Sequence, residues 1–191
     1  MKTGLFFGSF NPVHIGHMAL ANYFVEFTDI EQLWFVISPH NPLKKKGSLI
    51  NDQTRMEMVE LAIEGDTRFQ TCDVEFHMPK PSFTIDTLTY LSEKNPKHEF
   101  VLLMGSDGLL TFHKWKNYEQ IIAQYCRYIY PRKTQLPVDY PQHNNIIVIE
   151  DAPLIEVSSS FIRRSIKEKK DLRHFLPQKV SEYIERYGLY K

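Results

Sequence analysis

The sequence has few cysteines and no long hydrophobic run. Only two cysteines, Cys72 and Cys126, occur among the 191 residues. A structural zinc site needs about four Cys or His ligands at close spacing, and no such group is visible, so we expect neither a zinc site nor a disulfide framework. Both cysteines are predicted to be buried thiols in strand-like segments. No apolar run approaches the roughly twenty residues of a membrane helix, and no signal sequence is visible, so we predict a cytoplasmic protein without a membrane partner.

An excess of charge of either sign is also missing. Lysine plus arginine and aspartate plus glutamate each number 23, so the formal net charge is zero. A bulk electrostatic attraction to nucleic acid is therefore not expected, although a local basic pocket is compatible with this balance. A length of 191 residues with 42% hydrophobic residues is ordinary for one well-buried domain, which we assign to residues 1–191.

Strand-like and helix-like segments alternate along the chain. The predicted strands are 3–7, 32–37, 68–76, 99–104, 127–130 and 145–149. The predicted helices begin near His14, at Asn51 or Asp52, at Ser82 or Thr84, before Ile121, at Ser158 and at Pro177. This order is typical of an α/β fold with a Rossmann-like, open, mostly parallel sheet and helices on both faces. Ligands bind beyond the carboxyl ends of such strands, so the loops after the strands should converge on one edge.

The most informative segment is G-S-F-N-P-V-H-I-G-H, residues 8–17, between a predicted strand and a predicted helix. A helix N-terminus has unpaired N–H groups and a partial positive charge, so it attracts phosphate. Gly8 lets the backbone approach a ligand, and Pro12 fixes the loop before the helix. His14 and His17 are three residues apart and share a helix face, with Gly16 leaving open space between them. This spacing predicts a polyphosphate site; two surface histidines beside an ordinary turn are the alternative.

A second anion-binding pattern is V-S-S-S-F-I-R, residues 157–163. Ser158 can cap a helix, and Ser160 and Arg163 share one face of it. An arginine fork matches phosphate oxygens bidentately. Taken alone, the pattern is more typical of a well-capped helix with a solvated arginine.

Together the two segments resemble the signature boxes of the nucleotidylyltransferase superfamily, G-x-F-x-P-x-H-x-G-H and I-S-S-T-x-I-R. Ser160 takes the place of threonine and Val157 that of isoleucine. Members of the superfamily transfer a nucleoside monophosphate from a nucleoside triphosphate to a phosphate or similar acceptor and release pyrophosphate. The resemblance implies that His14, His17 and Arg163 act in catalysis. It also implies that ATP is bound by Gly8, Ser9, Phe10, His14, His17, Ser159, Ser160 and Arg163.

The middle of the chain resembles one family of that superfamily, the bacterial nicotinate-nucleotide adenylyltransferases. Residues 82–88, S-F-T-I-D-T-L, are similar to its S-Y-T-x-D-T-L segment, and residues 105–115 are similar to its G-x-D-x-L-x-x-F-x-x-W run. The end of the chain, from Phe175 to Tyr190, is similar as well. The resemblance implies transfer of AMP from ATP to nicotinate mononucleotide, which gives nicotinate adenine dinucleotide and pyrophosphate in NAD biosynthesis.

Further site residues follow from this resemblance. Trp115 offers an aromatic face to the pyridine ring, and Thr84 offers a donor to its carboxylate. Gly105 and Asp107 are expected to bind ATP, with Asp107 accepting hydrogen bonds from ribose hydroxyls. Arg132 is a third candidate contact to the substrates, on the nucleotide side.

The loop 39–46, P-H-N-P-L-K-K-K, departs from the P-P-H-K segment of the family because Leu43 takes the histidine position. Among its three lysines, Lys44 is the candidate contact to the ATP phosphates, whereas Lys45 and Lys46 are expected to be solvated. Mg²⁺ is expected to arrive with ATP, bridge phosphate oxygens and keep most of its waters, so no protein ligand to a metal is predicted.

Two alternatives stay open at this point. The first is an adenylyltransferase of the same fold whose acceptor is nicotinamide mononucleotide or phosphopantetheine. The second is a nucleotide-binding regulator that has lost turnover. A homo-oligomer is compatible with the sequence.

Overall fold

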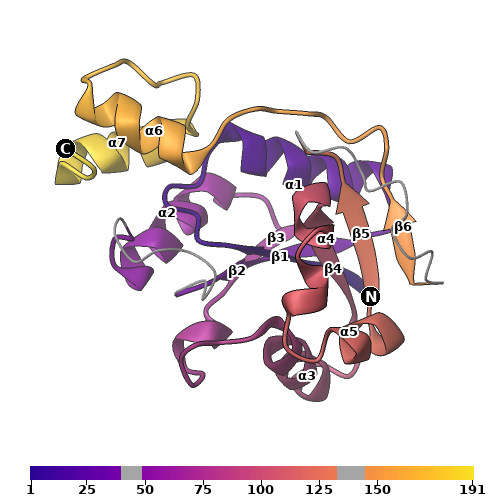
Figure 1. Cartoon of the computed structure of the whole chain (residues 1–191). Coiled ribbons are helices and arrows are strands. Elements are labelled where there is room, and N and C mark those ends of the chain that lie inside the picture. The colour runs from indigo at the N-terminus through magenta and orange to yellow at the C-terminus, as the bar shows by residue number, and fades with distance from the viewer. Residues whose placement is uncertain (40–48, 133–144) are drawn as a thin grey trace.

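Figure 1 shows a computed structural model of the chain, which describes residues 1–39, 49–132 and 145–191. The predicted phosphate contact Lys44 and its neighbours Lys45 and Lys46 lie outside the described residues.

Within the described residues, six strands form one sheet. They are β1 (Lys2–Gly8), β2 (Gln32–Ile37), β3 (Phe69–Cys72), β4 (Glu99–Gly105), β5 (Cys126–Tyr130) and β6 (Ile146–Val148). The strand order is β3-β2-β1-β4-β5-β6, and every neighbouring pair is parallel. The predicted Rossmann-like sheet is therefore confirmed. In this order the connections reverse direction between β1 and β4, which makes the carboxyl ends of these two strands the expected ligand site.

Helices cover both faces of the sheet (Figure 1). They are α1 (Ile15–Phe27), α2 (Asp52–Ile63), α3 (Thr84–Lys94), α4 (Ser106–Leu109), α5 (Tyr118–Gln124), α6 (Ser159–Lys167) and α7 (Gln178–Tyr187). Buried Phe24, Met58, Ile162 and Val180 place α1, α2, α6 and α7 in one core layer. Leu88 and Ile121 place α3 and α5 in the opposite layer. The apolar run in β4 therefore has cover on both sides, as predicted.

Two of the predicted caps are present. Asn51 Oδ1 accepts a hydrogen bond from the N–H of Gln53 at 2.8 Å at the start of α2. Ser158 Oγ accepts one from the N–H of Phe161 at 3.2 Å at the start of α6. Each side chain satisfies one of the unpaired donors of a helix N-terminus.

The segment 68–76 differs from the prediction. The strand ends at Cys72, and a 3₁₀ turn occupies Val74–Phe76. This turn points Glu75 inward, where its carboxylate accepts hydrogen bonds from Ser82 Oγ at 3.0 Å and Thr87 Oγ1 at 2.9 Å. The predicted start of this helix at Ser82 or Thr84 is confirmed at Thr84, the first residue of α3. Ser82 instead donates to Glu75, and the N-cap position is Phe83, whose side chain makes no capping bond.

Both cysteines are free thiols. Cys72 is buried, as predicted, whereas Cys126 is only partly buried. Among the described residues, no helix is both long enough and apolar enough to cross a membrane.

Candidate active site

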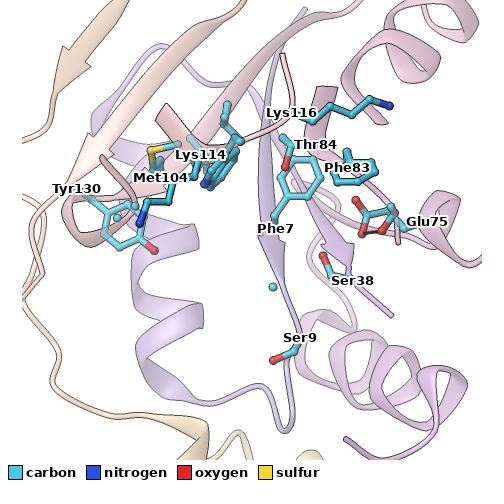
Figure 2. Close-up of a pocket in the computed structure, with 17 residues that line it drawn as sticks. Phe7, Ser9, Ser38, Glu75, Phe83, Thr84, Met104, Lys114, Lys116 and Tyr130 are labelled. Atoms are coloured by element: carbon cyan, nitrogen blue, oxygen red, sulfur yellow. Dashed lines mark hydrogen bonds between the residues drawn. The ribbon is translucent and has the colours of Figure 1, made fainter. Parts of the chain in front are cut away.

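A cavity of about 360 Å³ opens at the carboxyl ends of β1 and β4 (Figure 2). The first residues of α3 and the segment just after the 3₁₀ turn Phe112–Lys114 complete its walls. Five of the predicted site residues line it: Gly8, Ser9, Thr84, Gly105 and Trp115. Loops that follow different strands therefore meet at one edge of the sheet, as predicted from the fold class.

Trp115 and Thr84 form the acceptor end of this cavity, the part expected to hold the pyridine ring. The Trp115 ring is half-buried and meets the Phe112 ring edge to face, with centroids 5.3 Å apart. Thr84 is the first residue of α3, so the start of that helix brings it to the wall. In Figure 2, Phe83 and Glu75 lie on one side of Phe7, and Met104 and Tyr130 lie on the other.

Two lysines flank Trp115, and neither is among the site residues predicted from the sequence. Lys114 and Lys116 line the cavity. The Lys116 amine lies 2.8 Å from the Asp86 carboxylate and 4.8 Å from the centroid of the Phe83 ring. Their place on either side of Trp115 in K-W-K was a signal that could have been used, because the acceptor is an anion.

Glu75 and Arg55 were also missed. Glu75 lines the cavity with 3% of its surface exposed. Arg55 is fully buried; its guanidinium donates to the carbonyl of Ser9 and, at 3.0 Å, to that of Ser38. Arg55 had a local signal, a charged residue among the apolar positions of a helix. Glu75 had none, because its partners come from a later segment.

The two histidines lie at the start of α1, as predicted. His14 is the N-cap residue, and the His14 and His17 rings stack with centroids 3.7 Å apart. The backbone N–H of His14 points at Nδ1 of His17, 3.3 Å away. Because Nδ1 accepts this hydrogen bond, a neutral His17 ring carries its proton on Nε2, where it can be donated to a ligand.

His14 is a neutral imidazole at neutral pH. Its exposed fraction is 4%, and its buried Nδ1 has no hydrogen-bond partner among the described residues. Burial, helped by the positive charge of Arg132, lowers the pKa of His14 to about 4. His14 therefore acts as a polar, uncharged group rather than as a fixed cation.

Gly8, Phe10 and Gly16 of the first signature box pack against neighbouring rings. A Cβ added at Gly8 would lie 2.7 Å from the Phe10 ring, so Gly8 is needed to seat that ring. Phe10 is 1% exposed, and its ring centroid lies 5.0 Å from that of His17. The expected open space at Gly16 is wrong, because a Cβ there would lie 3.2 Å from Nδ1 of His14.

The second box reaches the first through hydrogen bonds to its carbonyl groups. Arg163 Nη1 donates to the Asn11 carbonyl at 2.8 Å, and Ser159 Oγ donates to the Pro12 carbonyl at 2.9 Å. Arg163 Nη2 also contacts Ser160 Oγ at 3.3 Å, so these two share one face of α6 as predicted. The structure therefore brings the predicted residues of both boxes together around the loop 9–12, next to the cavity at Ser9. We call this the phosphate end.

Asp107 and Arg132 lie over Gly105. A Cβ on Gly105 would be 2.5 Å from Asp107 Oδ1 and 3.0 Å from Arg132 Nε, so only glycine fits without displacement. Arg132 Nη1 is 3.6 Å from the Asp107 carboxylate, and Nη2 donates to the Tyr130 hydroxyl at 3.3 Å. Arg132 thereby contacts the cavity wall at Tyr130, and its positive charge acts on the His14 ring; its role on the nucleotide side stays a prediction.

Comparison with known proteins adds the family. The cytidylyltransferase-like family matches residues 5–165. A protein from Flavobacterium johnsoniae named probable nicotinate-nucleotide adenylyltransferase is 51% identical over 193 residues, which cover 100% of this chain and 100% of that protein. One with the same name from Porphyromonas gingivalis is 50% identical and covers 96% of this chain and 93% of its own length.

Solved structures give the same fold. The structure of Plasmodium falciparum nicotinic acid mononucleotide adenylyltransferase complexed with NaAD has a TM-score of 0.81 at 21% identity, covering 99% of this chain and 97% of that one. The same Plasmodium protein complexed with APC gives a TM-score of 0.79. At this low identity the likeness concerns the fold, whereas the identity of about half to the bacterial relatives spans the whole chain. The chain belongs to the cytidylyltransferase-like family and, within it, to the nicotinate-nucleotide adenylyltransferases.

Proposed function

We propose that this enzyme transfers AMP from ATP to nicotinate mononucleotide, giving nicotinate adenine dinucleotide and pyrophosphate. The observation that carries the proposal is the junction at Ser9. There the phosphate end, with His17 and Arg163, meets the cavity that holds Thr84 and Trp115. A nucleoside triphosphate and a pyridine nucleotide can thus meet at their phosphates with each base at its own end.

The reaction needs no covalent enzyme intermediate. An oxygen of the acceptor phosphate is already anionic at neutral pH and attacks the α-phosphorus of ATP. The bond from the α-phosphorus to its bridging oxygen breaks, and pyrophosphate leaves with that electron pair. The difficulty lies in bringing two anions together. Positioning of the two substrates and preorganised hydrogen-bond donors overcome it.

In this proposal His17 donates to the α-phosphate. Its Nδ1 accepts from the backbone N–H of His14, which leaves Nε2–H as the donor of a neutral ring. The neighbouring Phe6 and Phe10 rings hold the imidazole in place at centroid distances of 6.0 and 5.0 Å. A fixed donor of this kind stabilises charge on the phosphorus oxygens without reorganisation.

Arg163 holds the departing pyrophosphate in this proposal. Two of its five N–H donors contact Asn11 and Ser160, which fixes the guanidinium plane and leaves further donors for phosphate oxygens. Lys44, outside the described residues, is the predicted second cation. The other predicted ATP contacts are Gly8, Ser9, Phe10, Gly105, Asp107, Ser159 and Ser160, with Arg132 beside them.

Mg²⁺ is proposed to enter with ATP. No group of three or more His, Cys, Asp or Glu side chains suited to a metal occurs in 1–39, 49–132 and 145–191, and the phosphate end is built from imidazole, hydroxyl and guanidinium groups. These donors suit phosphate oxygens rather than Mg²⁺. The ion would therefore be held by the phosphates and water, where it neutralises negative charge.

The acceptor end fits a nicotinate ring. Trp115 presents a partly exposed aromatic face for stacking, and Thr84, at the first turn of α3, provides a hydroxyl and a helix start for the carboxylate. Lys114 and Lys116 add positive charge around the same ring. Carboxylate binding by these groups favours nicotinate mononucleotide over nicotinamide mononucleotide, which has an uncharged amide in place of the carboxylate.

Pyrophosphate release from the purified protein tests the proposal. ATP alone, ATP with nicotinate mononucleotide and ATP with phosphopantetheine are compared in the presence of Mg²⁺. We expect release only with the pyridine nucleotide, with one dinucleotide formed for each pyrophosphate. Pyrophosphate release with phosphopantetheine would show that the enzyme uses a different acceptor. Binding of ATP without pyrophosphate release in any mixture would identify a nucleotide-binding regulator.

Several predictions go with this proposal and await their own measurements. The chain is predicted to form one nucleotidylyltransferase domain over residues 1–191 and to be cytoplasmic. No nucleic-acid or membrane partner is predicted, and a homo-oligomer is compatible with the sequence.

A further inference from the structure

The phosphate loop 9–12 is held by the last part of the chain as well as by the two signature boxes. The Tyr190 hydroxyl donates to Oδ1 of Asn11 at 2.8 Å. The carbonyl of Phe175 accepts the N–H of Ile15, the first residue of α1, at 3.1 Å. Both Tyr190 and Phe175 lie beyond residue 165, where the family match ends. The general family pattern therefore does not account for either contact.

Asn11 is the point at which these supports meet. It is 2% exposed, its carbonyl is bound by Arg163 and its side chain is bound by Tyr190. Burial raises the pKa of Tyr190, so the phenol stays protonated and acts as the donor. Tyr190 thus fixes the rotamer of Asn11, and the carbonyl of the same Asn11 orients the guanidinium of Arg163.

The backbone on both sides of this contact is unusual. Phe10, just before Asn11, has φ of 41°, and Tyr190 has φ of 65°. Residues other than glycine rarely adopt these left-handed conformations, and they persist where surrounding contacts impose them. One partly buried hydrogen bond thus links Tyr190 to the neighbour of Phe10, and the two left-handed residues beside it indicate a loop that depends on outside support for its shape.

We propose that Tyr190 is a positioning residue for ATP, acting through Asn11 on the phosphate loop and on Arg163. Tyr190 touches no reacting atom in this account. It keeps the Asn11 carbonyl aimed at Arg163, and thereby keeps the guanidinium aimed at the triphosphate. The inference rests on the proposed function only in taking the loop 9–12 as the ATP site.

The test is Tyr190→Phe in the full chain, which removes one hydroxyl and keeps the ring. Calorimetry measures the Kd of a non-hydrolysable ATP analogue and, separately, that of nicotinate mononucleotide. Loss of one partly buried hydrogen bond that orders the loop is expected to weaken binding of the analogue by about 2- to 10-fold. Binding of the pyridine nucleotide should stay unchanged. Tyr187→Phe is the matched control, since that side chain lies three residues earlier, at the end of α7, and is 60% exposed.

A double-mutant cycle with Asn11→Ala separates positioning from general stability. If Tyr190 acts through Asn11, the two substitutions together weaken binding of the ATP analogue no more than Asn11→Ala alone. Unchanged analogue binding in Tyr190→Phe, with or without a lower Tm, overturns the proposal, and so does equal weakening for both ligands. Failure of the unmodified protein to bind the analogue would instead contradict the proposed function.

Discussion

At the phosphate end, a side chain of α2 donates to the carbonyl of Ser9, and side chains of α6 donate to the carbonyls of Asn11 and Pro12. At the acceptor end, Trp115 rests edge to face on one aromatic ring. The first arrangement is made of directional bonds that exist before ATP arrives, so little reorganisation is needed at the moment of reaction. The acceptor end consists of a ring face and charged side chains around a cavity, an arrangement that can discriminate between acceptors.

This contrast separates rate from selectivity. Substitutions at the phosphate end should lower kcat for every acceptor, whereas substitutions at the acceptor end should change KM for one substrate. Of the four predictions that follow, three test this division and one tests the neutral, buried state of His14; they begin with the largest effect.

His17→Ala should lower kcat by about 10²- to 10³-fold, the usual cost of losing one preorganised donor to a developing anion. The fold should persist, because the ring lies at a helix start rather than in the core. Steady-state pyrophosphate release and Tm are the measurements. His77→Ala, which removes a 75% exposed imidazole, is the control. A kcat near that of the unmodified protein would remove His17 from the catalytic step.

His14→Gln should change how stability depends on pH. Burial lowers the pKa of His14 from 6.5 to about 4 in the folded protein, so the unfolded chain binds this proton first. The unmodified protein has its full stability above about pH 6.5 and should lose about 3 kcal/mol through this group as the pH falls toward 4. The variant should lack that loss.

Urea unfolding of both proteins between about pH 7 and pH 4.5 gives this difference. His77→Gln, at an exposed histidine, should follow the unmodified protein. Parallel pH curves for His14→Gln and the unmodified protein would contradict a neutral, buried His14.

Trp115→Ala should raise KM for nicotinate mononucleotide by about 5- to 150-fold, which corresponds to the roughly 1–3 kcal/mol of one stacking contact. KM for ATP should stay close to its original value. Tyr90→Ala, which removes an aromatic ring from α3 outside this cavity, serves as the control. Equal increases in both KM values would assign Trp115 a packing role and end the proposed separation of the two regions.

Arg163→Lys should weaken the use of ATP by about tenfold, although the charge is retained. Lysine cannot present a planar fork to two phosphate oxygens while also contacting Asn11 and Ser160. The neighbouring exposed Arg164, replaced by lysine, is the matched control. A large fall in Tm with unchanged kinetics would show that Arg163 matters for helix packing only.

The parallel sheet and the phosphate end could be predicted because their signals are local. The apolar run of β4 indicates a strand covered on both faces, and His14 and His17 are related by helix periodicity alone. The two boxes could be joined only through the resemblance, since no local pattern brings Arg163 to the Asn11 carbonyl across the chain.

Other features depend on contacts that a sequence does not display. Glu75 turns inward because Ser82 and Thr87 donate to it, and that contact converts an expected strand into a turn. Gly16 looked like open space, but the His14 ring fills it. In each case a side chain from another segment decides the outcome, and its direction follows from tertiary packing.

The most direct test of the division between the two ends is kcat/KM of the unmodified enzyme for nicotinate mononucleotide and for nicotinamide mononucleotide. The two acceptors differ only in a carboxylate against a neutral amide. A pocket that gives charge-assisted hydrogen bonds to the carboxylate should prefer the nicotinate compound by about 10- to 150-fold, corresponding to the roughly 1.5–3 kcal/mol of such bonds. Equal kcat/KM for the two acceptors would contradict an acceptor end built to recognise the carboxylate.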